Sequence, residues 1–580
     1  MSTTTSTNVA YGGAAARPRV GLLNRFQPSS LVFIGMSLVL VVLIVAPLTA
    51  LIVKSFTDPA TGGFTVANYI DAYGKARHVQ ALVNTLYMGV AVVALSLAFA
   101  LPLAWGCSRT DMPFKSFIRA GVFGAFIIPP YLGGIGWILL AGPNSGWLNR
   151  AWQGLTGSEA SIVNIFSFEG LVLVMAINLY FTMFVLISAA FEMLNSELED
   201  AANILGAGPI KTAWKVTFPL VLPSILGSAL LTFLVCIALY GVPALISIPA
   251  RFPVVVIQLS EFFSYPLRIE TAAAYSIPLL LITAVLLLLQ RLILSRKGYT
   301  AVTGKGGERR MVRLGPWRWV LFGYSAFVVA LSVAMPALVL FMAAFSSSWV
   351  GGLSLSNLTL QNFNYVLFEH ATSQQAIVTS LGLGAVAATF AVLLALSISY
   401  IVQRKLVPMP GVLGYLCMAP FVIPGIVLAI AFYSVYALPP VALYGTYTIL
   451  ALAFVTRFLP IAYTTGSAGV RAIHPEMEEA VRILGGGRLY AIRKVVAPLL
   501  KRPLAAGWLL IFVPAAQELS TAVFLVGPKT RVVSVVLLDM TEEGEMEKLA
   551  ALGSVLLVII TIMVLLGIRL LGRDFMVRRS

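Results

Sequence analysis

The chain contains 580 residues, of which 59% are hydrophobic and 11% are charged, and its mean hydropathy is +0.93. Because a soluble domain carries about 25% charged residues, this composition excludes an ordinary water-soluble protein and predicts one embedded in lipid. The net charge of +16 is then interpreted as a sign of membrane orientation rather than nucleic-acid binding. The three cysteines and three histidines lie far apart in the sequence, so we expect neither a disulfide framework nor a metal site.

Twelve apolar stretches are long enough to cross a bilayer, which takes about 20 apolar residues. The first six are predicted at 31–53, 82–106, 117–141, 168–191, 220–247 and 271–294. The second six are predicted at 319–345, 377–402, 411–437, 446–468, 503–527 and 549–571. The predicted fold is therefore an all-α polytopic membrane protein with 12 transmembrane helices.

The distribution of basic residues predicts the orientation. If the N-terminus is cytoplasmic, the predicted inside segments hold 29 of the 39 Lys and Arg residues, the outside loops hold nine, and Arg457 lies within a span. Basic residues concentrate in cytoplasmic loops. We therefore expect a multi-pass membrane protein with both termini in the cytoplasm.

The two groups of spans are copies of each other. At an offset of 295, Gly89 pairs with Gly384 and Arg109 with Arg404, and at an offset of 279, Gly206 pairs with Gly485. Six spans per copy is an even number, so the two repeats are parallel rather than inverted. The predicted domains are a cytoplasmic segment at 1–30, a six-helix domain at 31–294, a basic linker at 295–318, a second six-helix domain at 319–571 and a tail at 572–580.

A charged segment follows the fourth span of each copy. Both segments begin with two acidic residues and an alanine. A glycine follows after four more residues, and a proline follows after a further twelve. Acidic side chains near a helix start favour its dipole, the glycine permits a sharp turn, and the proline redirects the next element. The pattern predicts a short helix, a turn and a return towards the membrane.

This spacing resembles the EAA loop in the permease subunits of ABC importers, which have the type I importer permease fold. In that family the loop forms a coupling helix that docks into a groove of a cytoplasmic ATPase. Asp200 stands where Glu is usual, and Val481 where Ala is usual. The resemblance implies coupling through Glu199, Asp200, Ala201, Ala202, Gly206 and Pro219 in the first copy, and through Glu478, Glu479, Ala480, Gly485 and Pro498 in the second. A single copy could equally be an amphipathic helix on the membrane surface; two copies at equivalent points favour coupling.

A nucleotide-binding loop is not recognisable in the sequence. The nearest approach, Gly298 to Gly306, has five residues instead of four between its first two glycines and lacks the hydroxyl residue that contacts Mg²⁺. We therefore expect no catalytic residue and no cofactor in this chain. ATP and Mg²⁺ would be bound by two copies of a partner ABC ATPase.

Two charged residues, Arg457 and Glu518, lie within predicted spans, where each costs about 2.5–3.5 kcal/mol at a helix centre. We hypothesise that they pair with each other and form part of a translocation path or gate; a static structural pair is the alternative. Their counterparts in the first copy, Asn178 and Leu239, are uncharged. Pro129 and Pro424 fall within spans and are assigned to the same path because proline kinks a spanning helix.

A fused chain of this length resembles the ferric-iron permease group, whose subfamily also includes thiamine, polyamine and 2-aminoethylphosphonate permeases. The resemblance implies a location in the bacterial cytoplasmic (inner) membrane and a periplasmic or lipid-anchored substrate-binding protein as a second partner. Ferric iron is the leading cargo and the other three are alternatives. A secondary transporter with two parallel halves and a membrane enzyme are more distant alternatives. A secondary transporter would not need the paired acidic loops. A membrane enzyme would need a cluster of catalytic side chains, and the sequence shows none.

Overall fold

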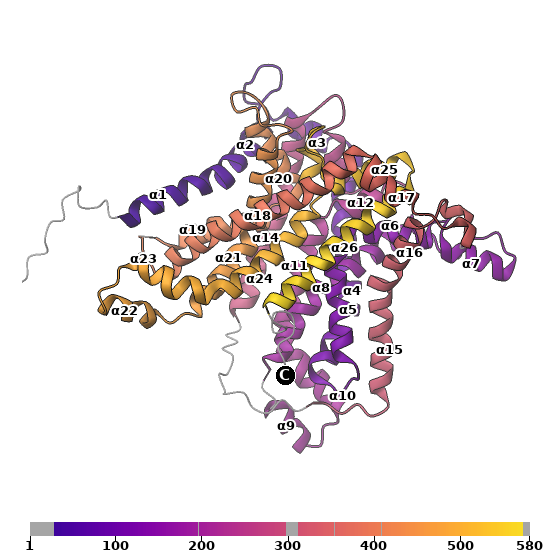
Figure 1. Ribbon diagram of the computed structural model, residues 1–580, viewed down its shortest axis with the longest axis horizontal. Helices are drawn as coiled ribbons and strands as arrows, with labels where there is room; N and C mark the ends of the chain where they lie inside the picture. Colours follow the sequence, from indigo (N-terminus) through magenta and orange to yellow (C-terminus); the bar gives the residue numbers. More distant parts are fainter. Residues whose placement is uncertain (1–27, 195–196, 297–310, 353, 408, 572–580) are drawn as a thin grey trace, which may run out of the picture.

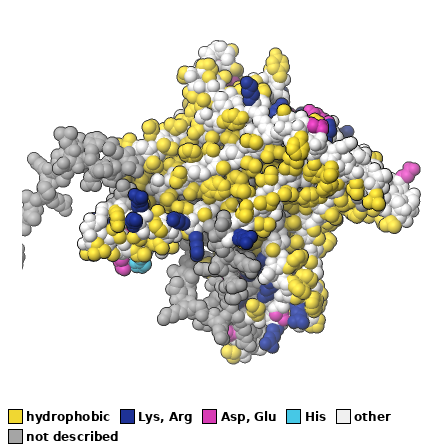
Figure 2. All heavy atoms as spheres, viewed as in Figure 1, with side chains coloured by type: hydrophobic (Ala, Val, Ile, Leu, Met, Phe, Trp, Pro, Cys, Tyr) yellow, Lys and Arg dark blue, Asp and Glu magenta, His cyan; other side chains and the backbone are white. Residues whose placement is uncertain are grey.

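The computed structural model describes residues 28–194, 197–296, 311–352, 354–407 and 409–571. These residues contain ten helices that are long and apolar enough to cross a membrane, or up to 12 spans if each of two bent helix pairs counts as one. Figure 2 shows a wide apolar surface across the middle of one face, with Lys and Arg side chains mostly below it. The prediction of an all-helical polytopic fold is confirmed.

The first repeat runs from α1 to α14 (Figure 1). Its spans are formed by α1 to α2, α4, the pair α5 and α6, α8, α11 and α14. The element bounds are α1 Pro28–Leu40, η2 Val41–Val45, α2 Ala46–Ser55, α3 Ala67–Tyr73, α4 Ala76–Arg109, α5 Lys115–Ile127, α6 Pro130–Ala141, α7 Trp147–Thr156, α8 Phe168–Glu192, α9 Glu197–Ile204, α10 Pro209–Thr212, η3 Ala213–Thr217, α11 Phe218–Ala238, α12 Gly241–Ile246, α13 Val255–Glu261 and α14 Ile269–Arg296.

The second repeat has the same order of spans: α15 to α16, α18, the pair α19 and α20, α21, α24 and α26. Its element bounds are α15 Trp317–Val329, η4 Ala330–Ala334, α16 Met335–Ala344, η5 Trp349–Gly351, η6 Leu355–Asn357, α17 Gln361–Asn364, η7 Tyr365–Glu369, α18 Ala371–Gln403, α19 Gly411–Met418, η8 Ala419–Val422, α20 Gly425–Phe432, η9 Tyr433–Ala437, α21 Tyr447–Arg471, α22 Pro475–Ile483, α23 Arg488–Ala491, η10 Ile492–Val496, α24 Ala497–Ala516, η11 Ala522–Phe524, α25 Val533–Glu543 and α26 Met546–Leu571.

The predicted domain boundaries are partly outside the described residues. Residues 1–27, 572–580 and most of the linker, 297–310, are not described. Within the predicted linker, α14 continues to Arg296 and α15 begins at Trp317. The end of the linker is attached to the end of α4, because Val312 N donates to Arg109 O at 2.8 Å and Asp111 N donates to Val312 O at 3.1 Å.

Two of the predicted continuous spans are sharply bent, which corrects the predictions for 117–141 and 411–437. Helices α5 and α6 meet at 100°, and the α19–η8 and α20–η9 segments meet at 109°. The breaks fall at Pro129 and Pro424, which cannot donate a backbone hydrogen bond. Both prolines have extended backbone conformations. Each bent span therefore turns within the bundle.

The first span of each half packs against the opposite half. Helix α2 contacts α20 and η9, while α16 contacts α6. Each of these spans contains one π-helical turn, η2 or η4, that ends just before a proline, Pro47 or Pro336. The wider turn leaves carbonyls available, and the second half uses them: Tyr436 Oη donates to Val42 O, and Thr456 Oγ1 donates to Leu43 O at 3.4 Å.

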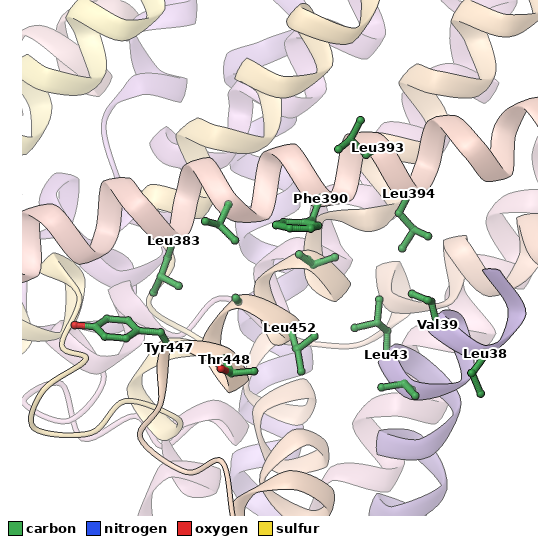
Figure 3. A pocket seen from close by; sticks show the side chains of 14 residues that line it. Leu38, Val39, Leu43, Leu383, Phe390, Leu393, Leu394, Tyr447, Thr448 and Leu452 are labelled. Carbon is green, nitrogen blue, oxygen red and sulfur yellow. The ribbon is translucent and has the colours of Figure 1, made fainter. Parts of the chain in front are cut away.

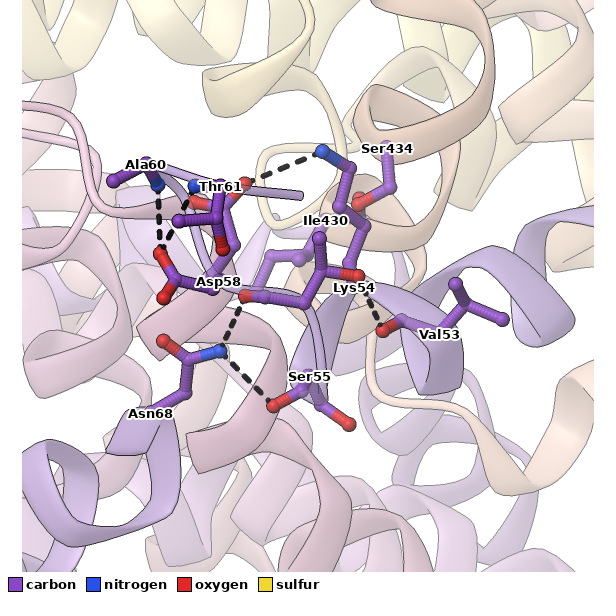
Figure 4. Close-up of polar contacts among 11 residues, drawn as sticks. Val53, Lys54, Ser55, Asp58, Ala60, Thr61, Asn68, Ile430 and Ser434 are labelled. Atoms are coloured by element: carbon purple, nitrogen blue, oxygen red, sulfur yellow. Dashed lines mark hydrogen bonds and ion pairs between the residues drawn. The ribbon is translucent and has the colours of Figure 1, made fainter. Parts of the chain in front are cut away.

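An asparagine fixes the chain after the first span of each half. In the first half, Asn68 Nδ2 donates to the carbonyls of Ser55 at 3.1 Å and Thr57 at 2.8 Å (Figure 4). Asn362 Nδ2 makes the equivalent bonds to Ala344 and Ser346 in the second half. In the intervening loop, Asp58 accepts from the backbone N–H groups of Ala60 and Thr61, and these donors lower the pKa of its carboxyl group. The repeat therefore extends into the loops.

Candidate functional site

The first acidic loop is held by a buried ion pair. Helix α9 presents Glu199, which is 5% exposed, to the guanidinium of Arg109 at the end of α4. The same carboxylate accepts a hydrogen bond from Thr217 Oγ1 at 2.6 Å. A buried carboxylate is stable in its charged form when paired and hydrogen-bonded in this way. Glu199 thus joins the loop to spans two and five of its half.

The second loop uses the same arrangement with one exchanged partner. Glu478 on α22 is 8% exposed and accepts from Arg404 Nε at 2.7 Å and from Tyr400 Oη at 2.5 Å. Arg404 also donates to Ile473 O at 2.9 Å. Arg404 is the repeat counterpart of Arg109. Val496 stands at the position of Thr217, so Tyr400 supplies the hydroxyl group instead.

The structure places the two predicted glutamates differently from their neighbours. Glu199 and Glu478 point into the protein, whereas Asp200 is partly buried and Glu479 is exposed. The alanines of the motif are partly buried at Ala202 and exposed at Ala201 and Ala480. A docking partner could therefore reach the second acidic residue of the second loop and the alanine faces, but not the buried carboxylates.

The most exposed apolar side chains of the loops were not identified from the sequence. Leu205 and Leu484 are each 87% exposed, and they follow Ile204 and Ile483, which are almost as exposed. An Ile-Leu pair immediately before the glycine occurs in both copies, and this repetition was the available signal. Isolated exposed leucines need no explanation, but the same pair at two equivalent tips indicates a contact surface. Figure 1 shows α9 and α22 projecting from the bundle.

The glycine and proline of each loop have distinct roles. Gly206 and Gly485 have φ angles of +77° and +85°, which favour glycine, and each ends its helix. The backbone bonds Ala207 N to Ala202 O and Gly486 N to Val481 O close the turn.

The predicted redirection of the chain at the prolines is wrong. Pro219 and Pro498 lie in the first turns of α11 and α24, and each follows a π-helical turn, η3 or η10, that leads directly into the helix. A proline in a helix removes the hydrogen bond to the carbonyl four residues earlier. The π-helical turn accommodates this loss within a continuous helix.

Arg457 and Glu518 form the predicted ion pair, with Arg457 Nε 2.9 Å from Glu518 Oε2. Glu518, at 8% exposure, does not lie on a spanning helix as predicted, because α24 ends at Ala516. The predicted span 503–527 is therefore too long, and so is 220–247, because α11 ends at Ala238.

The guanidinium group of Arg457 lies over the break of the second bent span. A Cβ atom on Gly425, the residue after Pro424, would lie 2.6 Å from Arg457 Nη1. Glu518 Oε1 also accepts from Thr521 N at 3.0 Å. The pair is therefore fixed between α21, the bent span and the segment that follows α24.

The same segment contacts the bent span of the first half. Gln517 Nε2 donates to Ile127 O, two residues before Pro129, at 3.0 Å. Nearby, a Cβ atom on Gly241 would lie 3.3 Å from both Leu519 Cδ2 and Tyr131 Cβ. Both bent spans and both post-helix segments thus meet at the junction of the two halves. We call the cluster of Arg457, Glu518, Gln517 and the two proline breaks the central junction.

The junction carries charge from one half. Asn178, the counterpart of Arg457, donates through Nδ2 to Val174 O in its own helix. Leu239, the counterpart of Glu518, is apolar and directly follows the last residue of α11. Among the described residues, no group of three or more His, Cys, Asp or Glu side chains could hold a metal ion. Within the described residues, the junction therefore contains a single ion pair, which the second half supplies.

Comparison with known proteins gives one family. Residues 31–299 and 411–577 match the family described as binding-protein-dependent transport system inner membrane component. The chain is similar to the ferric transport system permease protein FbpB of Actinobacillus pleuropneumoniae, with 26% identity over 533 residues, 90% of this chain and 75% of the relative.

Two further relatives cover different shares of the chain. The putative ferric transport system permease protein FbpB 1 of Haemophilus influenzae is 26% identical over 84% of this chain and 76% of its own length. The spermidine/putrescine transport system permease protein PotC of Escherichia coli K12 is 27% identical over 41% of this chain and 89% of its own length. The PotC protein is therefore about the size of one repeat of this chain.

Proposed function

Because the chain belongs to the family of binding-protein-dependent transport system inner membrane components, we propose that it forms the membrane path of an ABC importer for ferric iron. The similarity to ferric transport permeases over 90% and 84% of the chain carries the choice of cargo. The similarity to a polyamine permease is restricted to 41% of the chain. Thiamine and 2-aminoethylphosphonate remain the alternatives implied by the subfamily.

The two acidic loops are proposed to dock two copies of an ATPase, which bind ATP and Mg²⁺. The exposed Ile-Leu tips would enter the partner, because apolar side chains buried at the centre of an interface supply much of its affinity. Glu199 and Glu478 act as positioning residues: their ion pairs attach each loop to the end of the second span. Movement of the ATPase would thus be transmitted to the spans.

The central junction is proposed to lie on the translocation path. It is formed where both halves meet, and it contains Arg457, Glu518 and the breaks at Pro129 and Pro424. A carboxylate is a suitable contact for a hard cation such as ferric iron. The substrate-binding protein would deliver its cargo at the opposite end from the acidic loops. The excess of basic residues in the segments on the side of those loops supports a cytoplasmic location for the loops and both termini.

Iron uptake in iron-starved cells tests the proposal. Deletion of the gene is expected to abolish uptake of labelled ferric iron, and the wild-type gene is expected to restore it. Leu484→Glu, which places a charge at the second tip, is expected to prevent ATPase binding and uptake while leaving the protein in the membrane.

A matched control separates docking from general surface effects. Leu355 is 89% exposed and lies in the loop after the first span of the second half, away from α22, so Leu355→Glu should leave ATPase copurification unchanged. Normal copurification of ATPase with Leu484→Glu would contradict the docking proposal. Unchanged iron uptake after gene deletion would instead remove iron as the cargo and direct the assay to polyamines, thiamine and 2-aminoethylphosphonate.

A further inference from the structure

An apolar groove of about 730 Å³ opens between the first span of the first half and two spans of the second half, α18 and α21. Figure 3 shows side chains from α18, including Phe390 and Leu394, facing Val39 and Leu43 of the first span, with Leu452 of α21 beside them. All three helices are among the membrane-spanning segments. The groove is as large as the sites that proteins use for small ligands, roughly 300–1,000 Å³.

At the matching place in the first half, a tyrosine side chain bridges the two helices. Helix α15 packs against α4 there, with Tyr324 Oη donating to Ala98 O at 2.8 Å. The two π-helical turns align the first spans at an offset of 289, so the counterpart of Tyr324 is Gly35 in α1. A Cβ atom on Gly35 would meet nothing within 4 Å. The counterpart of Ala98 is Leu393, which lines the groove. Gly35, one helical turn before the groove-lining Leu38, thus leaves open the space that the tyrosine fills in the first half.

The groove ends at a polar rim on the side away from the acidic loops. Tyr447 and Thr448, the first residues of α21, line this end. Tyr447 Oη donates to Lys529 O at 2.9 Å, so the backbone of Lys529 lies next to the rim. The Lys529 side chain is exposed and has no ion pair within the described part of the chain.

We propose that this groove is a binding site for one phospholipid, with an acyl chain along α1, α18 and α21 and its phosphate near Lys529. Because the groove lies between membrane-spanning helices, lipid is the molecule that has access to it, and no protein partner is required to fill it. The apolar lining suits a hydrocarbon chain, and a lysine at the end of the groove complements a phosphate. This lipid would take the place that Tyr324 fills in the first half and would support the contact between α1 and the second half.

Lipid retention tests the site directly. The full-length wild-type protein, purified in detergent from cells and washed exhaustively, is expected to retain at least one phospholipid per chain, counted by native mass spectrometry and by lipid extraction. Gly35→Tyr, which reproduces the bridge of the first half, should lower that number by one. Gly323→Tyr is the matched control, because Gly323 on α15 also has open space around it but lies outside the groove, and it should retain the wild-type number.

A second variant keeps the test decisive if Gly35→Tyr inserts poorly. Lys529→Glu leaves the apolar lining intact and reverses the charge at the rim, so it should shorten the retention of the phospholipid at least several-fold during detergent washing. A wild-type protein that loses all its phospholipid as fast as Lys529→Glu would overturn the proposal. So would equal lipid numbers in wild type and Gly35→Tyr, or the retention of a peptide or a non-lipid molecule in the groove.

Discussion

The ion pair beneath the second acidic loop allows a quantitative test of the positioning role of Glu478. The perturbation is a double-mutant cycle with Glu478→Gln, Arg404→Gln and the combination. Removing one partner of a buried pair costs about 3–5 kcal/mol because the other charge stays buried and unpaired. The side chains of Arg404 and Glu478 keep 13% and 11% exposure, and Arg404 retains its bond to Ile473 O, so we expect the lower end of that range.

The appropriate assay is amide hydrogen exchange of residues 475–485 in the purified chain, because local opening of α22 exposes the pair. A loss of about 3 kcal/mol corresponds to roughly a 100-fold faster exchange. The double variant should exchange little faster than either single variant, giving a coupling energy of about 3 kcal/mol. The α9 loop, held by its own pair of Arg109 and Glu199, provides an internal control that should not change.

Strictly additive effects of the two substitutions would refute the reasoning, because they would show that the two side chains act independently. An increase in exchange rate of less than about threefold in every variant would also refute it, since a contribution that small is typical of exposed ion pairs, which stabilise by only about 0–1 kcal/mol. In either case the ion pair would not be what holds α22 to the second span, and the positioning role of Glu478 would be ruled out.

Further predictions concern the loop turns, the central junction and the asparagine of the second half. Gly206→Ala and Gly485→Ala should each destabilise their loop by about 1–2 kcal/mol through the left-handed backbone, while Gly485→Asn should cost less; protease sensitivity of each loop reports this. Glu518→Gln should abolish iron uptake while leaving ATPase copurification intact. If the double variant Glu518→Gln, Arg457→Gln takes up iron normally, the ion pair is not part of the translocation path. Asn362→Ala removes two hydrogen bonds and should lower thermal stability by about 1–3 kcal/mol, detectable as a lower melting temperature.

The long spans and their repetition could be predicted from the sequence because hydropathy and spacing depend on local composition. All twelve predicted spans correspond to helices or bent pairs. The bends were missed because proline inside an apolar stretch is compatible with either a mild kink or a sharp break, and packing decides between them. The overlong span at 503–527 has the same origin: Gln517 and Glu518 are surrounded by apolar residues in the sequence, but their side chains bond to Ile127 and Arg457 across the bundle.

The acidic loops show a different limit of sequence reasoning. The spacing predicted a short helix and a glycine turn, and both are present in each loop, yet nothing in the spacing indicates which acidic residue faces inward. That choice depends on Arg109 and Arg404, which lie about 75–90 residues earlier in the sequence at the ends of the second spans. The repeat contained the relevant signal, because both arginines align at the same offset, but the alignment alone did not connect them to the loops.

The fusion of both halves into one chain explains why the central junction is charged on one side. If two identical halves met around an axis, every charge would occur twice, and the junction would hold two arginines and two glutamates at the high cost of buried ions. Here Asn178 bonds within its own helix and Leu239 is apolar, so a single pair is buried. The one arginine neutralises the one glutamate when no cargo is present. On the path proposed above, a passing cation would compete with Arg457 for Glu518, and this competition would let the carboxylate contact the ion without holding it permanently.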